Sequence, residues 1–301
     1  LADAGVGAVV MYSLFEEQLR YEEQWATRVE EEHAESFAEA LTYFPLEPSG
    51  NTGVTEQYLR TLEAGAAAVS VPVIASINGS TLGSWTQAAR RMQDAGAAAI
   101  ELNIYFVPGD LSTPAREVED RHVAILQAVK DVVSVPVAVK CSPYFSSFGA
   151  FATRLVDAGA DGLVLFNRFL QPDVDLDTMS VEPGFGLSDP AEGRLPRTWL
   201  ASLHGRVPAS LAASTGVETA DDVVKFLASG ADVVMTTSAL VRHGAGYAGE
   251  LLAGLRGFLA ERHLSLQQLR GMLAVPGDAD ANRYARSGYV SALERAKRVY
   301  G

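Results

Sequence analysis

The sequence is poor in cysteine, since Cys141 is the only one among 301 residues. One thiol excludes an internal disulfide framework and a cluster of iron and sulfur held by several cysteines of this chain. Such cysteine usage is typical of the reducing cytosol, which predicts a cytoplasmic protein. We expect Cys141 itself to be a small buried hydrophobic residue. No apolar run approaches the roughly 20 residues that cross a bilayer, and no basic, apolar leader opens the chain, so no membrane partner is predicted.

Basic residues are also scarce. The sequence has 24 Lys and Arg against 37 Asp and Glu, a formal net charge of −13 and a pI near 4.8. A surface of this charge repels nucleic acid and anionic membranes, so the expected partner is a small molecule. We predict no metal site. The length suits a single α/β barrel, which commonly needs about 250 residues.

One pattern recurs along the chain: a helix end, a glycine, and then an apolar run rich in β-branched residues, as in DAGVGAVVMYS, DAGAAAIELNI, DAGADGLVLFN and ASGADVVMTTS. Glycines 5, 96, 159 and 230 suit the left-handed position that closes a helix. The runs that follow resemble strands buried on both faces, as in parallel sheets. Segments 71–77, 135–142 and 208–216 add three more, which makes seven strand candidates separated by amphipathic helices.

This alternation predicts an α/β fold of the TIM (β/α)8 barrel class, one strand short of closure. We expect the missing first strand to lie upstream of residue 1, so that residues 6–13 form the second barrel strand and residues 232–238 the eighth. One domain is expected over residues 1–301. It would carry an inserted helical segment at about 14–70, long loops at 105–117 and 169–196, and C-terminal helices at about 245–301.

The inserted segment is expected to contain an acidic helix from Glu16 to Leu41 and a second helix near Glu56 to Leu62. The acidic helix is open to three interpretations: a lid, a dimer contact or a solvated surface helix. Its Trp25, Val29 and Phe37 indicate at least one buried face.

The last two strand candidates end in residues suited to a phosphate. Ser214-Thr215-Gly216-Val217 follows one, and Thr219 is a plausible cap for the next helix; Thr236-Thr237-Ser238 follows the other. Backbone N–H groups and helix N-termini in these two loops often bind phosphate in barrels. Either loop alone is equally well explained as turn and capping residues, but their pairing favours a phosphate site.

Polar residues also end the other strand candidates. Lys140 is expected to point into the mouth of the barrel, as a snorkelling side chain, a cation for an electron-rich ligand, or a Schiff-base lysine. Glu101 and Asn103 share one strand face. An unpaired interior carboxylate is costly, so we predict that Glu101 pairs with Lys140. Ser76 and Asn167 complete the ring of polar strand ends.

These motifs, in this order, are SINGST, IELNIY, VAVKCSPYFS, LVLFNRF, ASTGVET and TTSAL. They resemble the dihydroorotate dehydrogenase superfamily over nearly the whole chain. The segment SLFEEQ, from Ser13 to Gln18, resembles a bacterial branch called dihydroorotate dehydrogenase-like.

The resemblance implies FMN as cofactor. It places Ser76 and Asn103 near the isoalloxazine ring, Lys140 toward its N1/O2 edge, and Asn167 beside the flavin or the substrate. Lys140, Asn103 and Asn167 would be the catalytic set. The family's phosphate-binding positions match Thr215, Gly216, Thr237 and Ser238.

The sequence departs from the family at its base. Dihydroorotate dehydrogenases carry a Cys or Ser within N-x-S-C-P-N, where this chain has Phe106, whose ring cannot accept a proton. The family's lysine after the second barrel strand is replaced by Tyr12 and Ser13. Tyr105 and Asp110 are possible replacement acids or bases, although each also suits a structural role.

The leading hypothesis is an FMN oxidoreductase of pyrimidine-metabolism type that acts on a CH–CH or related bond of a substrate other than orotate. Two alternatives remain: a non-catalytic flavin-binding protein, and a phosphosugar aldolase or isomerase with Lys140 as the Schiff base. The resemblance also implies a homodimer, and the single cysteine implies that electrons pass to a soluble molecule or to a separate electron-transfer subunit.

Overall fold

The computed structural model describes residues 1–22, 53–81, 83, 85–106, 108–168, 172–182 and 186–300. The chain forms two compact units, residues 1–141 with 157–161, and residues 142–156 with 162–301. In both units parallel strands alternate with helices, which confirms the predicted α/β fold of the TIM-barrel class. The prediction of one barrel domain stays a prediction.

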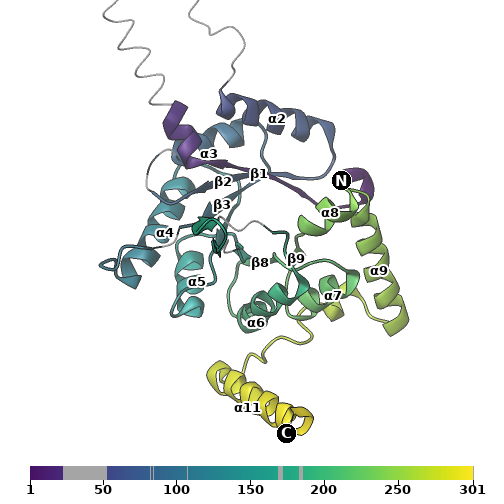
Figure 1. Cartoon of the computed structure of the whole chain (residues 1–301). Helices are drawn as coiled ribbons and strands as arrows, with labels where there is room; N and C mark the ends of the chain where they lie inside the picture. The colour runs from purple at the N-terminus through teal and green to yellow at the C-terminus, as the bar shows by residue number, and fades with distance from the viewer. Residues whose placement is uncertain are drawn as a thin grey trace, which may run out of the picture. The chain divides into compact units, whose positions relative to one another are not determined.

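The described part of the first unit has four parallel strands, hydrogen-bonded in chain order: β1 (Val9–Phe15), β2 (Val73–Gly79), β3 (Ala99–Ile104) and β4 (Val137–Cys141). A short helix precedes them, η1 (Ala2–Ala4), and the longer helices that connect or flank them include α2 (Val54–Ala68), α3 (Trp85–Asp94) and α4 (Ala115–Lys130) (Figure 1). The strands are buried on both faces: on β3, the aliphatic Ile100 and Leu102 lie on one face, and the polar Glu101 and Asn103 are buried on the other.

In the described part of the second unit, β5 (Gly162–Leu165), β8 (Ser210–Ala213) and β9 (Val233–Val234) run parallel in that order. Its helices include α5 (Phe148–Asp157), η3 (Pro190–Gly193), α6 (Arg194–Leu203), α7 (Ala220–Ala228), α8 (Ser238–His243), α9 (Tyr247–Arg262), α10 (Leu266–Leu269) and α11 (Ala281–Tyr300). The core of this unit is aromatic. The Phe148 ring lies 4.8 Å from Phe166 and 5.1 Å from Trp199, between centroids.

All seven predicted strands are present, with shifted ends: residues 6–13 become 9–15, and residues 232–238 shorten to 233–234. The four predicted glycine stops are confirmed, since Gly5, Gly96, Gly159 and Gly230 have φ of 86°, 94°, 102° and 109°. These angles favour glycine because a Cβ is strained there. The predicted C-terminal helices are confirmed as α9, α10 and α11.

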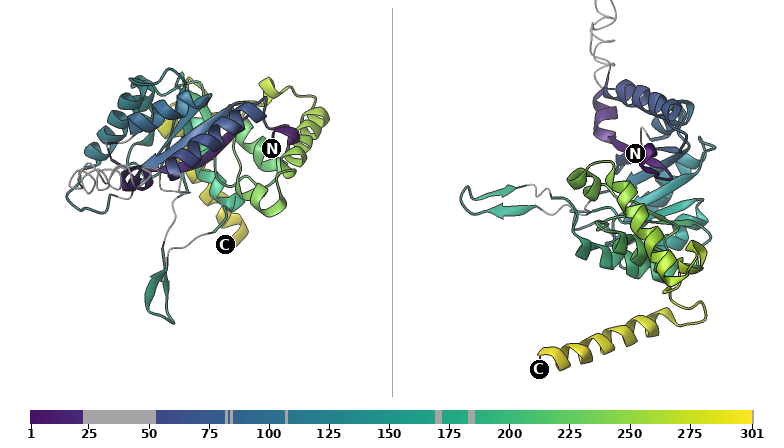
Figure 2. Two further views of the ribbon diagram at one scale, coloured as in Figure 1. Left: turned by 90° about the horizontal axis from the view of Figure 1, so that it is seen from above. Right: turned by 90° about the vertical axis from the view of Figure 1, so that its right-hand side faces the viewer.

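The predicted loop 169–196 contains more structure than expected. An antiparallel hairpin of β6 (Asp173–Asp175) and β7 (Ser180–Glu182) projects from the second unit (Figure 2), and η3 follows it. The hairpin presents Val174 opposite Val181 on one face, and both side chains are exposed. The prediction of one irregular loop over 169–196 is therefore wrong for these two strands, in which apolar and polar residues alternate.

The inserted segment is described only in part. Residues 16–22 are helical, as predicted for the start of the acidic helix, whereas Trp25, Val29 and Phe37 lie outside the described residues. The second helix of the insert, predicted near 56–62, is confirmed as the longer α2. Among the helices that can be described, none has the length and apolar character needed to cross a membrane.

Candidate functional site

A row of polar side chains crosses the four strands of the first unit. Ser13 Oγ on β1 lies 2.8 Å from Ser76 Oγ on β2, and Ser76 Oγ lies 3.3 Å from Glu101 Oε1 on β3. Lys140 Nζ on β4 lies 3.5 Å from the same Glu101 oxygen. Four consecutive strands therefore contribute one residue each to a continuous polar network.

The predicted pairing of Glu101 with Lys140 is confirmed. The Glu101 side chain is 4% exposed, whereas that of Lys140 is 18% exposed. A carboxylate this buried needs partners, and Lys140 and Ser76 supply a cation and a hydroxyl. Lys140 is the member of the pair that keeps access to solvent, so its ammonium is the group available to a ligand.

Asn103 lies one strand period beyond Glu101, and the register places it beside Lys140 on β4 and Asn78 on β2. Asn103 is buried, at 7% exposure. The first unit therefore brings together three of the predicted site residues, Ser76, Asn103 and Lys140, on neighbouring strands. Their roles with a flavin stay predictions.

Phe106, in the family's base position, packs against α4. The guanidinium of Arg121 lies 4.9 Å above its ring, and the His122 ring lies 5.7 Å away, between centroids. The Phe106 side chain is thus engaged in a cation–π and aromatic contact. Asp110, a suggested replacement base, accepts hydrogen bonds from the backbone and hydroxyl of Ser112, at 2.8 and 2.7 Å, which suits a turn residue.

Tyr58 on α2 is a residue that sequence analysis missed. Its hydroxyl accepts from the Ser76 N–H at 2.9 Å and donates to the Ser76 carbonyl at 3.3 Å. The register between β1 and β2 shifts between Val10 and Ser13, which adds one residue to β1 close to Ser76. Tyr58 contacts the Ser76 backbone next to this irregularity. Burial raises the pKa of Tyr58 to about 12, so it remains a neutral donor.

Glu16, the first acid of the SLFEEQ segment, was also missed as a site residue. Its side chain is buried, and it accepts hydrogen bonds from the N–H groups of Ser80 at 2.8 Å and Thr81 at 3.1 Å, and from the Thr81 hydroxyl. Burial by itself raises the pKa of Glu16, but these hydrogen bonds outweigh it and hold that pKa below its usual value. Glu16 therefore fixes the loop that follows β2.

In the second unit, the loop after β8 holds two predicted phosphate-binding residues. Thr215 and Gly216 have φ of 79° and 72°, and the Thr215 hydroxyl donates to the Phe166 carbonyl at 3.2 Å. A Cβ at Gly216 would lie 2.6 Å from the Gly193 nitrogen. Glycine is thus required here by close backbone packing against η3, a reason that sequence analysis did not foresee.

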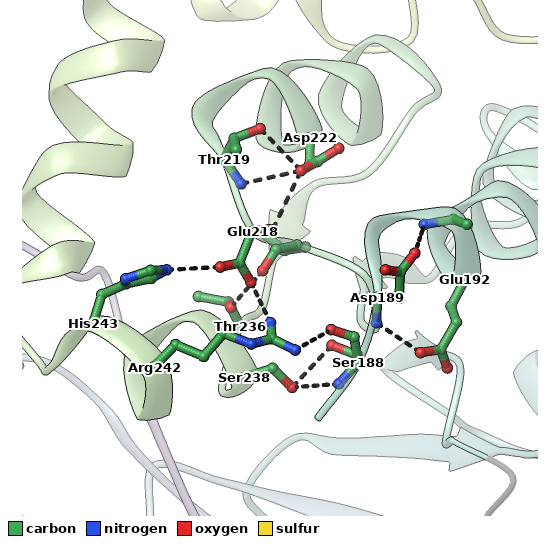
Figure 3. Close-up of polar contacts among 12 residues, drawn as sticks. Ser188, Asp189, Glu192, Glu218, Thr219, Asp222, Thr236, Ser238, Arg242 and His243 are labelled. Carbon is green, nitrogen blue, oxygen red and sulfur yellow. Dashed lines mark hydrogen bonds and ion pairs between the residues drawn. The ribbon is translucent and has the colours of Figure 1, made fainter. Parts of the chain in front are cut away.

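The loop after β9 holds the other two predicted phosphate-binding residues, Thr237 and Ser238. Thr237 is the N-cap residue of α8, and Ser238 Oγ accepts from the N–H and the hydroxyl of Ser188, each at 2.9 Å. Figure 3 shows this contact beside the Glu218 carboxylate. Asn167 follows β5 and is half-buried. The predicted cap at Thr219 is confirmed, with Asp222 as its capping-box partner.

Known proteins resemble this chain. A family model described as dihydroorotate dehydrogenase matches residues 34–259. The dihydroorotate dehydrogenase B (NAD(+)) catalytic subunit of Bacillus pumilus is 32% identical over 212 residues, which cover 68% of this chain and 67% of that protein. A putative dihydroorotate dehydrogenase A (fumarate) of Aeropyrum pernix is 30% identical over 212 residues, 67% of each chain.

The family match covers more than half of the chain and includes the six strand-end motifs from SINGST to TTSAL, whereas SLFEEQ at residues 13–18 lies before it. Bacterial relatives named as catalytic subunits of dihydroorotate dehydrogenase B support the bacterial branch. The chain therefore belongs to the dihydroorotate dehydrogenase family of FMN-dependent flavoproteins.

Proposed function

We propose that this chain is an FMN-dependent oxidoreductase that acts on a CH–CH or related bond of a small molecule other than dihydroorotate. The observation that carries the proposal is the polar row that ends at Lys140, in a member of an FMN-dependent family. The chemistry of the row fits a flavin ring, because it offers a cation and hydroxyl groups beside a buried carboxylate.

FMN would supply hydride exchange at N5. Lys140 would hold positive charge at the N1/O2 edge of the ring, where negative charge develops on reduction. Ser76 and Asn103 would orient the ring, and Asn167 the substrate. Thr215, Gly216, Thr237 and Ser238 would bind the phosphate through hydroxyl and backbone donors.

The substrate proposal rests on Phe106. A phenyl ring has no atom that accepts a proton, and the contacts with Arg121 and His122 keep that ring against α4. A base at this position is what the family uses to abstract a proton from dihydroorotate. We therefore propose a different substrate, whose proton goes to another group or to water.

We also propose a cytoplasmic homodimer that exchanges electrons with a soluble molecule or with a separate subunit. The buried Cys141 supports electron exchange through a separate molecule or subunit. Burial raises the pKa of its thiol to about 12, and the thiol is inaccessible as a ligand of an iron–sulfur cluster. Two relatives are named as catalytic subunits, which supports a separate subunit for electron transfer.

The test is an absorbance spectrum of the purified full-length protein, with mass spectrometry of the ligand released on denaturation. FMN bound to the wild type, weakened by Lys140→Met and retained by Lys130→Met, would support the proposal; Lys130 is a matched control because it pairs with Asp161 at 2.7 Å. A protein that cannot be reconstituted with FMN would refute it. Turnover screens then separate an enzyme from a non-catalytic flavin protein, and rapid turnover of dihydroorotate would refute the substrate proposal.

A further inference from the structure

We propose that Arg242 is a positioning residue that ties together the two loops assigned to the FMN phosphate, residues 214–218 and 236–238. The proposal deepens the proposed function, because it explains how this chain would discriminate FMN from a flavin without phosphate. Arg242 acts through Glu218 and Ser188 rather than on the phosphate itself.

The guanidinium of Arg242 bridges two segments that are far apart in the chain. Nη1 pairs with the Glu218 carboxylate, two residues after Gly216, and Nη2 donates to the Ser188 carbonyl at 2.9 Å (Figure 3). The planar fork of an arginine suits such a bridge, because two of its donors point in fixed directions. The side chain is 33% exposed, so the bridge lies partly within the protein.

Ser188 is held a second time by the same helix. Its N–H and hydroxyl both contact Ser238 Oγ at 2.9 Å, and Ser238 lies one helical turn before Arg242 on α8. The carbonyl and the N–H of one residue are therefore fixed from two points on α8. Ser238 and Arg242 of α8 thus both hold Ser188, and Arg242 also holds Glu218 in the loop that carries Gly216.

Arg242 also compensates a negative charge. Glu218 is 20% exposed, and His243 Nε2 lies 2.7 Å from its second oxygen. The hydrogen bond with His243, together with Arg242, holds the pKa of Glu218 below its usual value, so it is ionised at neutral pH. A carboxylate beside an anion-binding loop repels a phosphate unless cations offset it, and Arg242 is the cation that is always charged.

Two effects follow from loss of Arg242: the loops keep only their direct hydrogen bond, from the Thr236 hydroxyl to the Val217 carbonyl at 3.0 Å, and Glu218 loses its permanent counter-charge. Both weaken binding of the FMN phosphate, whereas riboflavin, which has no phosphate, is insensitive to them. Arg242→Ala should therefore raise the Kd for FMN about tenfold or more and change the Kd for riboflavin by no more than about twofold. Glu218→Gln in the Arg242→Ala background should recover part of the loss, because the repelling charge is gone.

The experiment is calorimetric titration of the full-length apoprotein with FMN and with riboflavin, for the wild type, Arg242→Ala, Arg242→Lys and the double variant. Arg256→Ala, an exposed position on α9, is the matched control. Equal weakening of FMN and riboflavin, or no weakening of FMN, would overturn the proposal. Arg242→Lys should lie between the wild type and Arg242→Ala, because an ammonium keeps the counter-charge for Glu218 but cannot reproduce the two-pronged contact of the guanidinium.

Amide hydrogen exchange tests the positioning role of Arg242 independently of FMN binding. Exchange at residue 188 and at residues 214–218 should speed up in Arg242→Ala and not in Arg256→Ala. If the wild type fails to bind FMN but exchange speeds up, the proposed cofactor site is wrong and the positioning role stands. If exchange does not change, the positioning role is wrong, whatever the affinity for FMN.

Discussion

Replacing Lys140 with methionine leaves the buried Glu101 carboxylate without its cation. Glu101 is 3% exposed as a residue and would keep only the Ser76 hydroxyl, at 3.3 Å, as a described partner from the polar row. Removing one partner of a buried ion pair typically costs about 3–5 kcal/mol of unfolding free energy. Because Lys140 is 18% exposed and water reaches the pair from its side, we expect the lower end, about 3 kcal/mol.

The opposite substitution is expected to be milder. Glu101→Gln leaves an ammonium that can turn toward solvent, so it should cost about 1 kcal/mol, as for a lost hydrogen bond. The double variant should be more stable than Lys140→Met alone, with a coupling free energy of about 1–3 kcal/mol, since the neutral amide no longer needs a cation.

Urea unfolding of the four apoproteins, followed by circular dichroism, measures these differences. Lys130→Met is the control, because its exposed pair with Asp161 should contribute no more than about 1 kcal/mol. A Lys140→Met protein no less stable than the Lys130→Met control, or a coupling near zero, would refute the reasoning that the pair is held together by burial.

Three further predictions concern the first unit. Tyr58→Phe removes both hydrogen bonds to Ser76 and should lower the free energy of unfolding by about 1–2 kcal/mol at pH 7. Because burial raises the pKa of Tyr58 to about 12, the stability of the wild type should also fall as pH rises from about 10 to 12. Urea unfolding at alkaline pH should show this loss in the wild type and not in the variant. Burial lowers the pKa of His122 to about 4, so stability should fall by on the order of 3 kcal/mol as pH drops from about 6.5 to 4, and His122→Gln should flatten that dependence. Phe106→Cys should not confer turnover of dihydroorotate in a spectrophotometric assay, because the side chain at this position packs on Arg121; clear turnover would show that it reaches the substrate instead.

The parts of the fold that were predictable rest on local signals. Gly96 and Gly159 stop helices because their φ is positive, and the apolar runs after them form strands because both faces are buried. Lys140 and Glu101 were paired in advance because the cost of an isolated buried carboxylate requires a cation on a neighbouring strand.

The rest depends on register and on contacts between distant segments. Tyr58 contacts Ser76 because β1 carries an extra residue, and nothing in the strand pattern marks that bulge. Ser188 lies 54 residues from Arg242, so their contact follows from the tertiary fold alone. The hairpin differs, because acidic and apolar residues alternate at 173–177 and this pattern alone predicts a strand.

An acidic chain that binds a phosphorylated cofactor must keep its carboxylates from repelling it. Three buried or half-buried acids are satisfied by donors from another segment: Glu16 by backbone N–H groups, Glu101 by Lys140, and Glu218 by Arg242. These acids therefore serve as internal acceptors that fix strand ends and loops, rather than as surface charge. It follows that removing a donor cation should be more damaging than removing its acid, because the acid left behind is both unpaired and negative. The same asymmetry is thus expected in two separate measurements, unfolding free energy for Lys140 and FMN affinity for Arg242.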